Sequence, residues 1–396
     1  MLRSLNHSEY RRMWFSMLAM MSGLQMSFIA QGYLAYDLSN SASVLGIVYG
    51  AQAVPMLLFC LFAGVAADRF GRKRIIQLGQ IVAATIALLI AISIYTEYIV
   101  WQHLMVMGII YGLVMAFTMT ARQASIPDLV PKADLENAVA LNGVLLSITT
   151  TAAPGIGGLL YALAGPWVVF SVVACLGLIS VILTNKLSSL TPPSQSHPPV
   201  MQEIIIGLKY INGFPALKIL IIMALIIALL ALPFRFVLPV FVVDVYHKGP
   251  AALGFMMSMM GVGSFIGALI FAIKKDGNRG TLLIGICALS GIVLLLIVLT
   301  PNYISGLILI AILGITDAGR KITIQSWIMK LSKPQFRGRV LSLYMMTFGL
   351  VPLIVMPVGF AMQHLGGRWV IGFMALILIL ISILLGLGKN PLKSLK

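Results

Sequence analysis

Charged residues are scarce in this chain, and acidic residues are the scarcest of them. Only 11 of its 396 residues are Asp or Glu, and all charged residues together make up 10% of the sequence. A water-soluble domain carries about 25% charged residues. Hydrophobic residues make up 60% of the chain, so the composition excludes an ordinary soluble domain and predicts an integral membrane protein.

Cysteine is also rare, and its three residues, Cys60, Cys175 and Cys287, are isolated within apolar runs. This spacing offers no disulfide framework and is typical of buried structural thiols. The five histidines do not recur at the spacing of metal ligands. We therefore expect no metal site and no resident cofactor.

Motifs for nucleotide binding and covalent catalysis are absent from the sequence. It has no Gly-x-x-x-x-Gly-Lys-Ser/Thr stretch to hold ATP phosphates and no nucleophile elbow. Paired acids and histidine clusters are also missing from its hydrophobic runs. These absences argue against an ATP-driven pump and against a membrane-embedded enzyme.

Long hydrophobic runs are abundant. A helix of roughly 20 apolar residues crosses a bilayer, so the chain has room for about twelve of them. We expect an all-α integral membrane fold with twelve transmembrane helices in two pseudo-symmetric six-helix bundles. The predicted spans are residues 13–36, 44–67, 75–94, 101–120, 137–162 and 167–183, then 214–240, 251–273, 281–299, 302–327, 340–362 and 369–387.

The chain divides into two similar halves around a stretch rich in Ser and Pro. This stretch begins a predicted cytoplasmic linker at 187–213, which includes a short interfacial helix from residue 201 to 212. The linker separates an N-terminal bundle at 1–186 from a C-terminal bundle at 214–396. A weak repeat relates the halves, and such repeats are typical of transporters whose binding site lies near the membrane midplane.

Basic residues outnumber acidic ones, which gives a formal net charge of +16. They cluster in alternate connections between the spans, whereas the opposite connections hold only Lys248 and Arg368. Because Lys and Arg resist translocation, this pattern predicts that both termini and the linker are cytoplasmic. The positive charge therefore follows membrane topology, and we expect no nucleic-acid partner.

A short basic turn between the second and third predicted spans carries the most distinctive motif. It reads Gly-x-x-x-Asp-Arg-x-Gly-Arg-Lys and resembles the signature loop between helices 2 and 3 of the major facilitator superfamily of secondary transporters. The residues that match are Gly64, Asp68, Arg69, Gly71, Arg72 and Lys73.

The resemblance implies that this turn is a gate. Asp68 would bind the positive N-terminus of helix 11, near Arg337-Gly338-Arg339, and hold the cytoplasmic side shut. The alternative is a positive-inside anchor with no moving part. In the family an acid near the end of helix 4 often receives an arginine of the loop. Here the segment 121–136, predicted as a cytoplasmic connection, carries Arg122 and then Asp128.

A second motif lies in the fifth predicted span. The run Ala153-Pro154-Gly155-Ile156-Gly157-Gly158 resembles the Gly-Pro-x-x-Gly-Gly core of the family's antiporter motif, with Ala153 at a Gly position. The resemblance implies export rather than import and draws attention to Pro154, Gly155, Gly157 and Gly158. The alternative is ordinary close packing, since glycines let a neighbouring helix approach.

Polar groups inside the predicted spans are candidates for function because they are costly there. Asp317 lies well inside a span, and Arg320 and Lys321 follow one helical turn later. Asp317 could bind a proton or substrate, or could simply neutralise Arg320. Arg235 could attract an anionic or carbonyl-rich substrate, or could reach the outer interface. Gln25 and Asn142 could hydrogen-bond a ligand or a neighbouring helix.

Two further segments resemble one branch of the major facilitator superfamily in particular. Residues 121–131 with 134–138, and residues 337–343, resemble the bacterial branch that contains enterobactin exporters and macrolide efflux proteins. This resemblance implies proton-driven export of small amphipathic molecules, drugs or siderophores, by alternating access. We expect a monomer in a bacterial inner membrane, with helices 1, 4, 7 and 10 lining the substrate path. The alternative is an importer or facilitator of a nutrient or lipid-like metabolite on the same fold.

Overall fold

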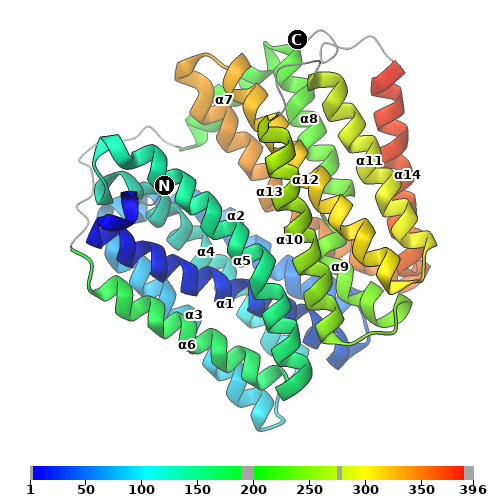
Figure 1. Cartoon of the computed structure of the whole chain (residues 1–396), viewed down its shortest axis with the longest axis horizontal. Coiled ribbons are helices and arrows are strands. Elements are labelled where there is room, and N and C mark those ends of the chain that lie inside the picture. Colours follow the sequence, from blue (N-terminus) through cyan, green and yellow to red (C-terminus); the bar gives the residue numbers. More distant parts are fainter. Residues whose placement is uncertain (1–2, 189–199, 274–278, 388–396) are drawn as a thin grey trace. The chain divides into compact units, whose positions relative to one another are not determined.

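The computed structural model describes residues 3–188, 200–273 and 279–387, apart from the side chains at 60–61, 63–70, 200–204, 272 and 279. Every regular element within these residues is a helix (Figure 1). The predicted all-α class is therefore confirmed.

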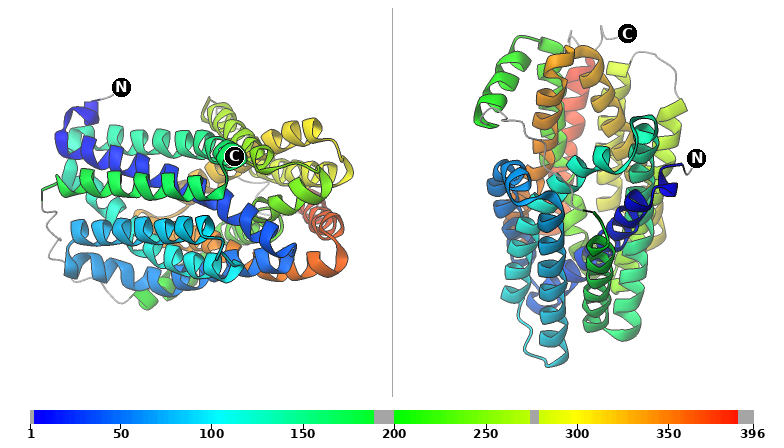
Figure 2. Two further views of the ribbon diagram at one scale, coloured as in Figure 1. Left: turned by 90° about the horizontal axis from the view of Figure 1, so that it is seen from below. Right: turned by 90° about the vertical axis from the view of Figure 1, so that its left-hand side faces the viewer.

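The chain forms two compact units. The first comprises Met1–Gln195 with His247–Ser258, and the second comprises Ser196–Tyr246 with Met259–Lys396. The predicted division into 1–186, 187–213 and 214–396 stays a prediction. Within each unit the long helices run alongside one another over much of their length (Figure 2).

The first unit contains the six long helices expected of the first half. They follow a single turn of 3₁₀ helix at Arg3–Asn6, and a second such turn, Lys132–Asp134, precedes the fifth. The helices are α1 (Ser8–Ser39), α2 (Ala42–Phe70), α3 (Arg72–Tyr95), α4 (Trp101–Leu129), α5 (Leu135–Ala164) and α6 (Pro166–Asn185).

The second half begins with α7 (Val200–Asn212), at the place predicted for the short interfacial helix. A 3₁₀ turn, Pro334–Phe336, precedes α13. The remaining helices are α8 (Pro215–Leu230), α9 (Phe234–Val240) with a π-helical turn at Phe241–Val245, α10 (Pro250–Ile273), α11 (Arg279–Leu299), α12 (Tyr303–Leu331), α13 (Arg337–Leu365) and α14 (Gly367–Leu387).

The predicted span at 214–240 is matched by one apolar segment, Pro215–Val245, but its helix is not continuous, because the structure divides it into α8 and α9. The break occurs at residues 231–233, where Ala231 and Leu232 both donate backbone hydrogen bonds to the carbonyl of Ile227. Pro233 follows at once and has no backbone N–H to continue the helix. Arg235 consequently lies in the first turn of α9 rather than in the middle of a long helix.

The predicted loop at 121–136 is also partly wrong. Helix α4 continues to Leu129, so Arg122 lies inside the helix. Pro127 does not end the helix, although proline disfavours helical structure in the residue before it. The packing of α4 against its neighbours, which composition alone does not report, outweighs this local preference.

Eleven helical segments of the described chain are long and apolar enough to cross a membrane. Helix α12, with 29 residues, occupies the place of the predicted span 302–327 but is not among the eleven. Three charged residues, Asp317, Arg320 and Lys321, lie near its middle. The structure thus confirms the helical membrane fold, whereas the predicted count of twelve spans stays a prediction.

Close backbone contacts hold α2 and α4 together in the first unit. A Cβ atom at Gly108 would come within 2.9 Å of the carbonyl oxygen of Val48, and one at Gly112 would overlap the backbone of Gln52. In lipid, helices associate through such close packing because apolar side chains gain nothing by leaving the bilayer. The two glycines of α4 therefore set the separation between α2 and α4.

A buried polar cluster joins α1, α3 and α6. Gln80 Nε2 donates to Ser16 Oγ and to Thr184 Oγ1, at 3.0 Å each, and the hydroxyls of Ser16 and Ser180 are 2.8 Å apart. Hydrogen bonds between helices are a common device of membrane proteins. This cluster specifies which faces of the three helices meet.

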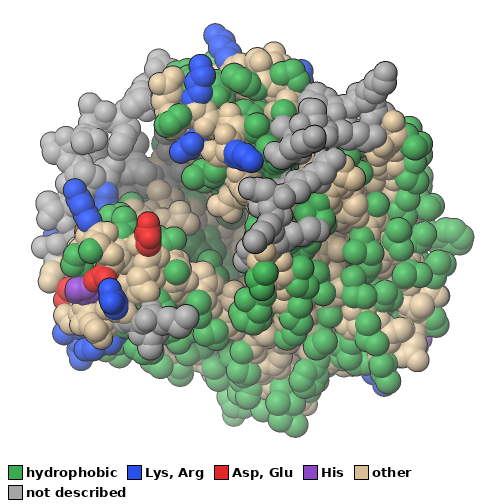
Figure 3. Space-filling model, turned by 45° about the horizontal axis from the view of Figure 1, so that its top comes forward, with side chains coloured by type: hydrophobic (Ala, Val, Ile, Leu, Met, Phe, Trp, Pro, Cys, Tyr) green, Lys and Arg blue, Asp and Glu red, His purple; other side chains and the backbone are tan. Residues whose placement is uncertain are grey.

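Large hydrophobic side chains cover much of the surface. On the face drawn in Figure 3 they form broad areas, whereas Lys and Arg side chains gather in limited regions. Examples from both units are Leu58 and Phe62 on α2, Leu163 on α5, and Trp369 and Phe373 on α14, which are 60%, 63%, 76%, 80% and 66% exposed. Such surfaces are unfavourable in water and suit contact with lipid.

Candidate functional site

The turn between α2 and α3 depends on Gly71. Its φ is 85° and its ψ is 128°, a conformation that residues with a side chain rarely adopt. Among the described residues, a Cβ atom here would meet nothing within 4 Å. The requirement for glycine therefore comes from the backbone conformation and not from crowding.

Arg72 starts α3 and ties it to the end of α4. Its side chain is 7% exposed, and its Nη1 donates to Asp128 Oδ2 and to the carbonyl of Ala124, at 2.6 Å each. Asp128 is therefore the acid of α4 that receives an arginine of the basic turn. Its assignment needed the structure, because the sequence predicts that Asp128 lies in the connection after the fourth span, with the basic Arg122 at the end of that span.

Lys73 anchors the same turn to the end of α6. Its Nζ donates to the carbonyl of Asn185 at 2.9 Å and also to the carbonyl of Leu187. The side chains of Asp68 and Arg69, and the surroundings of Gly64, lie outside what the structure describes. The contact predicted between Asp68 and the start of α13 stays a prediction.

The glycine-rich run of α5 makes close contacts on two sides. A Cβ atom at Gly157 would lie 3.1 Å from the Cα of Met26 on α1. One at Gly158 would lie 2.6 Å from the carbonyl oxygen of Pro250, and one at Gly155 would lie 2.7 Å from Ser258 Oγ. Pro154 and Gly158 are buried, and both belong to the same compact unit as the start of α10.

Three of the predicted candidates meet at one cavity in the second unit. Arg235, Asp317 and Arg320 all line a space of about 20 Å³, which is room for about one water molecule. The other lining residues are Ile227, Ala231, Leu232, Met260, Ser290, Leu313 and Thr316. The helix break before α9 brings Arg235 to this cavity, which is contributed by α8 to α12.

Asp317 is held by two cations of its own helix. It accepts from Arg320, and its Oδ2 is 2.7 Å from Lys321 Nζ. The side chain of Asp317 is 13% exposed and that of Arg320 is 3% exposed, whereas Lys321 is 46% exposed. Asp317 therefore does neutralise Arg320, as one reading of the sequence predicts, but it also faces the cavity with Arg235.

The ring of Phe348 on α13 lies beside both cations. Arg320 Cζ is 5.9 Å from the centre of this ring and Lys321 Nζ is 5.6 Å from it. Cation–π attraction of this kind strengthens when the groups are removed from water. Movement of either cation would therefore change the contact between α12 and α13. The sequence does not mark Phe348 as a functional residue, because phenylalanine is common in membrane spans.

A larger cavity, of about 70 Å³, lies between α1, α4 and α5 of the first unit. Asn142, predicted as a polar contact, is on its wall together with Arg122. Its lining residues are spaced three and four apart on α1 and α4, as one face of a helix requires. They are Tyr10, Met13, Trp14, Met17, Met119, Arg122, Gln123, Ile126, Asn142 and Leu146.

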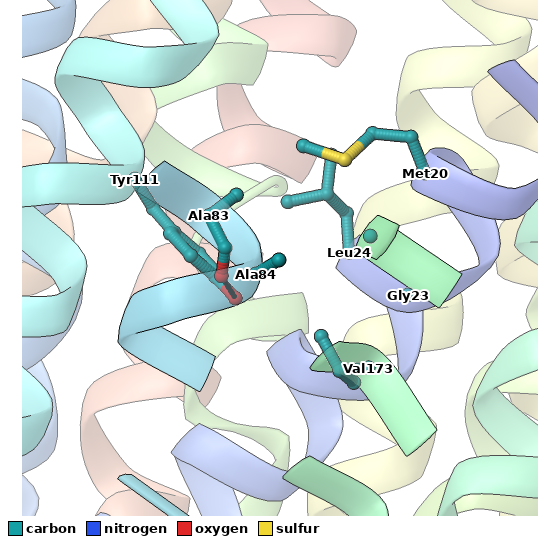
Figure 4. A pocket seen from close by; sticks show the side chains of 8 residues that line it. Met20, Gly23, Leu24, Ala83, Ala84, Tyr111 and Val173 are labelled. Atoms are coloured by element: carbon teal, nitrogen blue, oxygen red, sulfur yellow. Dashed lines mark hydrogen bonds between the residues drawn. The ribbon is translucent and has the colours of Figure 1, made fainter. Parts of the chain in front are cut away.

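Gln25 does not line either of these cavities. Its Nε2 is buried and finds no hydrogen-bond partner among the described residues. A small cavity of about 10 Å³ nearby on α1 is bounded by Met20, Leu24 and Val173 and by the ring of Tyr111 (Figure 4). This space is almost wholly apolar, so it is a packing gap and not a ligand site.

The fold and the motifs agree with one family. A major facilitator-type family profile, described as Transmembrane secretion effector, matches residues 2–392. The chain belongs to this family. It is a multi-pass membrane transporter and not an enzyme, which confirms the resemblance seen in its motifs.

Relatives of this transporter carry names that describe transport. It is 27% identical to the multidrug efflux pump Tap of Mycolicibacterium fortuitum over 82% of each chain. It is 24% identical to the staphyloferrin A transporter of Staphylococcus aureus over 79% of each chain. Among solved structures, the nucleoside transporter NupG has a TM-score of 0.72 at 15% identity, covering 96% of this chain and 99% of the other. That last likeness concerns the fold alone.

Proposed function

We propose that this transporter exports small amphipathic molecules, drugs or siderophores, in exchange for protons by alternating access. Similarity to an efflux pump over 82% of both chains is the observation that carries the direction of transport. The resemblance of Pro154, Gly155, Gly157 and Gly158 to an antiporter motif supports the same direction.

Asp317 supports coupling to protons. It is an acid in the middle of a membrane helix, at a cavity, and its charge binds Arg320 and Lys321. These two ion pairs favour the charged carboxylate, so Asp317 would take up a proton only in a helix arrangement in which Arg320 and Lys321 have moved away from it. Because both cations also lie against Phe348, their release would change the packing of α12 on α13. Proton binding would in this way bias one helix arrangement over the other.

The basic turn supplies the proposed gate. Arg72 and Lys73 fasten the turn to α4 and α6, which gives Asp68 a rigid base from which to reach the start of α13. The proposal includes cytoplasmic termini, a bacterial inner-membrane location and a monomer as the working unit. The distribution of Lys and Arg supports the orientation of the termini.

Transport into proteoliposomes under imposed pH gradients tests this function. The compounds are erythromycin and ethidium, which are cationic, and fusidate, which carries a carboxylate, each given to vesicles with an acidic or an alkaline lumen and to vesicles without protein. An exchanger accumulates its substrate when the lumen is acidic, whichever way the protein is inserted. Accumulation driven by an acidic exterior indicates an importer, and uptake that is independent of the gradient indicates a facilitator. Either of these last two results contradicts the proposal.

Asp317→Asn tests the coupling step separately. The amide keeps the size of the side chain and lacks the charge, so we expect gradient-driven accumulation to fall at least tenfold while exchange without a gradient persists. Glu136→Gln, which neutralises an exposed acid at the start of α5, is the control and should behave as wild type. Wild-type gradient dependence in Asp317→Asn would exclude this residue as the coupling group.

A further inference from the structure

Arg122 is a buried cation for which the described protein supplies no partner. The residue is 3% exposed, and Nε, Nη1 and Nη2 all lack a hydrogen-bond acceptor within the described part of the chain. Arg72, which is buried to a similar degree, donates hydrogen bonds to a carboxylate and to a backbone carbonyl. Burying a charge without a partner is strongly unfavourable, so a protein gains by satisfying it.

Arg122 borders the cavity of about 70 Å³ between α1, α4 and α5. This volume exceeds that needed for a water molecule several-fold and suits a small polar group with the carbons next to it. Met13, Met17 and Met119 form much of the apolar wall. Methionine side chains adapt readily to differently shaped ligands.

The other polar groups of the wall are largely committed to the protein. Trp14 Nε1 donates to the carbonyl of Leu141 at 3.2 Å, and the Tyr10 hydroxyl donates to the carbonyl of Ala138 at 2.7 Å. These two donors therefore stabilise the contact of α1 with α5. Arg122, with the amides of Gln123 and Asn142 on the same wall, is left to recognise a ligand.

We propose that this cavity binds the carboxylate of an amphipathic substrate, with Arg122 as its direct ligand. The planar guanidinium fork matches a carboxylate in a two-pronged arrangement, and a low-dielectric site strengthens it. The carbons next to the carboxylate would then lie against the methionines, and the rest of the apolar body would extend beyond this cavity. A cationic head group is disfavoured here because it would meet a second buried cation.

This inference rests on the proposed transport function, because it names the class of substrate that the transporter takes. It is nevertheless tested by binding alone, in detergent and without any pH gradient. Failure of proton coupling would therefore leave the binding result intact, and failure of the binding result would leave proton-coupled export of uncharged molecules standing.

The experiment compares three probes with the same naphthalene body and different head groups. 1-Naphthaleneacetate carries a carboxylate, 1-naphthaleneacetamide is its uncharged counterpart, and 1-naphthylmethylamine is cationic. Binding to the purified full-length protein is measured by quenching of tryptophan fluorescence and by thermal shift. We expect the carboxylate to bind wild type at least tenfold more tightly than the amide or the amine.

Variants at position 122 show whether the preference comes from this side chain. Arg122→Gln should reduce the preference to twofold or less, and Arg122→Lys should keep an intermediate preference because it retains charge but not the fork. Arg11→Gln removes an exposed cation of the same unit and should leave the preference unchanged.

Two outcomes overturn the proposal. One is equal binding of the three probes by wild type, which needs no variant and so decides the matter even if Arg122→Gln does not fold. The other is a folded Arg122→Gln protein that keeps the tenfold preference. Loss of thermal stability in Arg122→Gln with an unchanged preference would assign this arginine a structural role instead.

Discussion

Two arginines of the first unit are buried to a similar degree and differ in their surroundings. Arg72 is 6% exposed and lies between Asp128 and the carbonyl of Ala124, whereas Arg122 is 3% exposed and faces a cavity. The difference is chemical, because a partner offsets the cost of burying the charge of Arg72, whereas Arg122 bears this cost without a partner among the described residues. We therefore assign Arg72 to structure and Arg122 to binding.

Asp128→Ala should destabilise the protein by removing the carboxylate that binds Arg72. The free energy of unfolding should fall by about 2 kcal/mol. This is less than for a fully buried pair, because the side chain of Asp128 is 42% exposed. Thermal unfolding in detergent measures it. Lys132→Ala, a nearby exposed change, should cost little. Equal stability of the Asp128→Ala and wild-type proteins would mean that Arg72 finds another partner without cost.

At the scale of the elements, helices are joined by turns whose backbone conformation limits the residue. Gly71, Gly165 and Gly366 all have φ between 84° and 87°, and each stands where one long helix ends and the next begins. The pattern recurs in both units. Each of these turns can reverse the chain within a single residue because glycine has no Cβ.

Gly71→Ala should destabilise the hairpin of α2 and α3 by about 1 kcal/mol, because alanine is strained at positive φ. The matched control is Gly143→Ala in α5, where a Cβ meets nothing within 4 Å and helical φ suits alanine. That control should be neutral or slightly stabilising. Thermal unfolding of both variants gives the comparison, and the same sign for both would contradict the explanation.

Gly158→Ala should slow transport at least fivefold. The new Cβ would lie 2.6 Å from the carbonyl oxygen of Pro250, so α5 and the start of α10 must move apart to accept it. The effect is measured as exchange rate in proteoliposomes, with Gly143→Ala on the same helix as control. An unchanged rate would show that this close contact is not needed in any transport step.

At the scale of the whole molecule, the distribution of charge predicts the orientation of the chain. We expect Glu97, between α3 and α4, to face outward and Lys132, between α4 and α5, to face the cytoplasm. In a variant without Cys60, Cys175 and Cys287, an impermeant maleimide added to intact cells should label Glu97→Cys. It should label Lys132→Cys only after the cells are opened. The reverse pattern would invert the proposed topology.

Much of the candidate site could be predicted from single residues, because charge inside a membrane span is conspicuous. Asp317 and Arg320 are recognisable from their position and their spacing on one helix. That Arg235 lies at the same cavity could not be predicted from the sequence, because it depends on the break between α8 and α9. The sequence places Arg122 in a connection, and only the continuation of α4 to Leu129 shows it as a buried side chain at a cavity.

The sequence by itself determined the membrane class, the positions of most helices and the family. Hydrophobic length and the alternation of basic connections follow directly from the chemistry of the bilayer, and they need no knowledge of which helices touch. Only the tertiary structure decided which buried charges have partners. That outcome depends on side chains brought together from helices far apart in the chain, such as Arg72 with Asp128, and no local pattern records it.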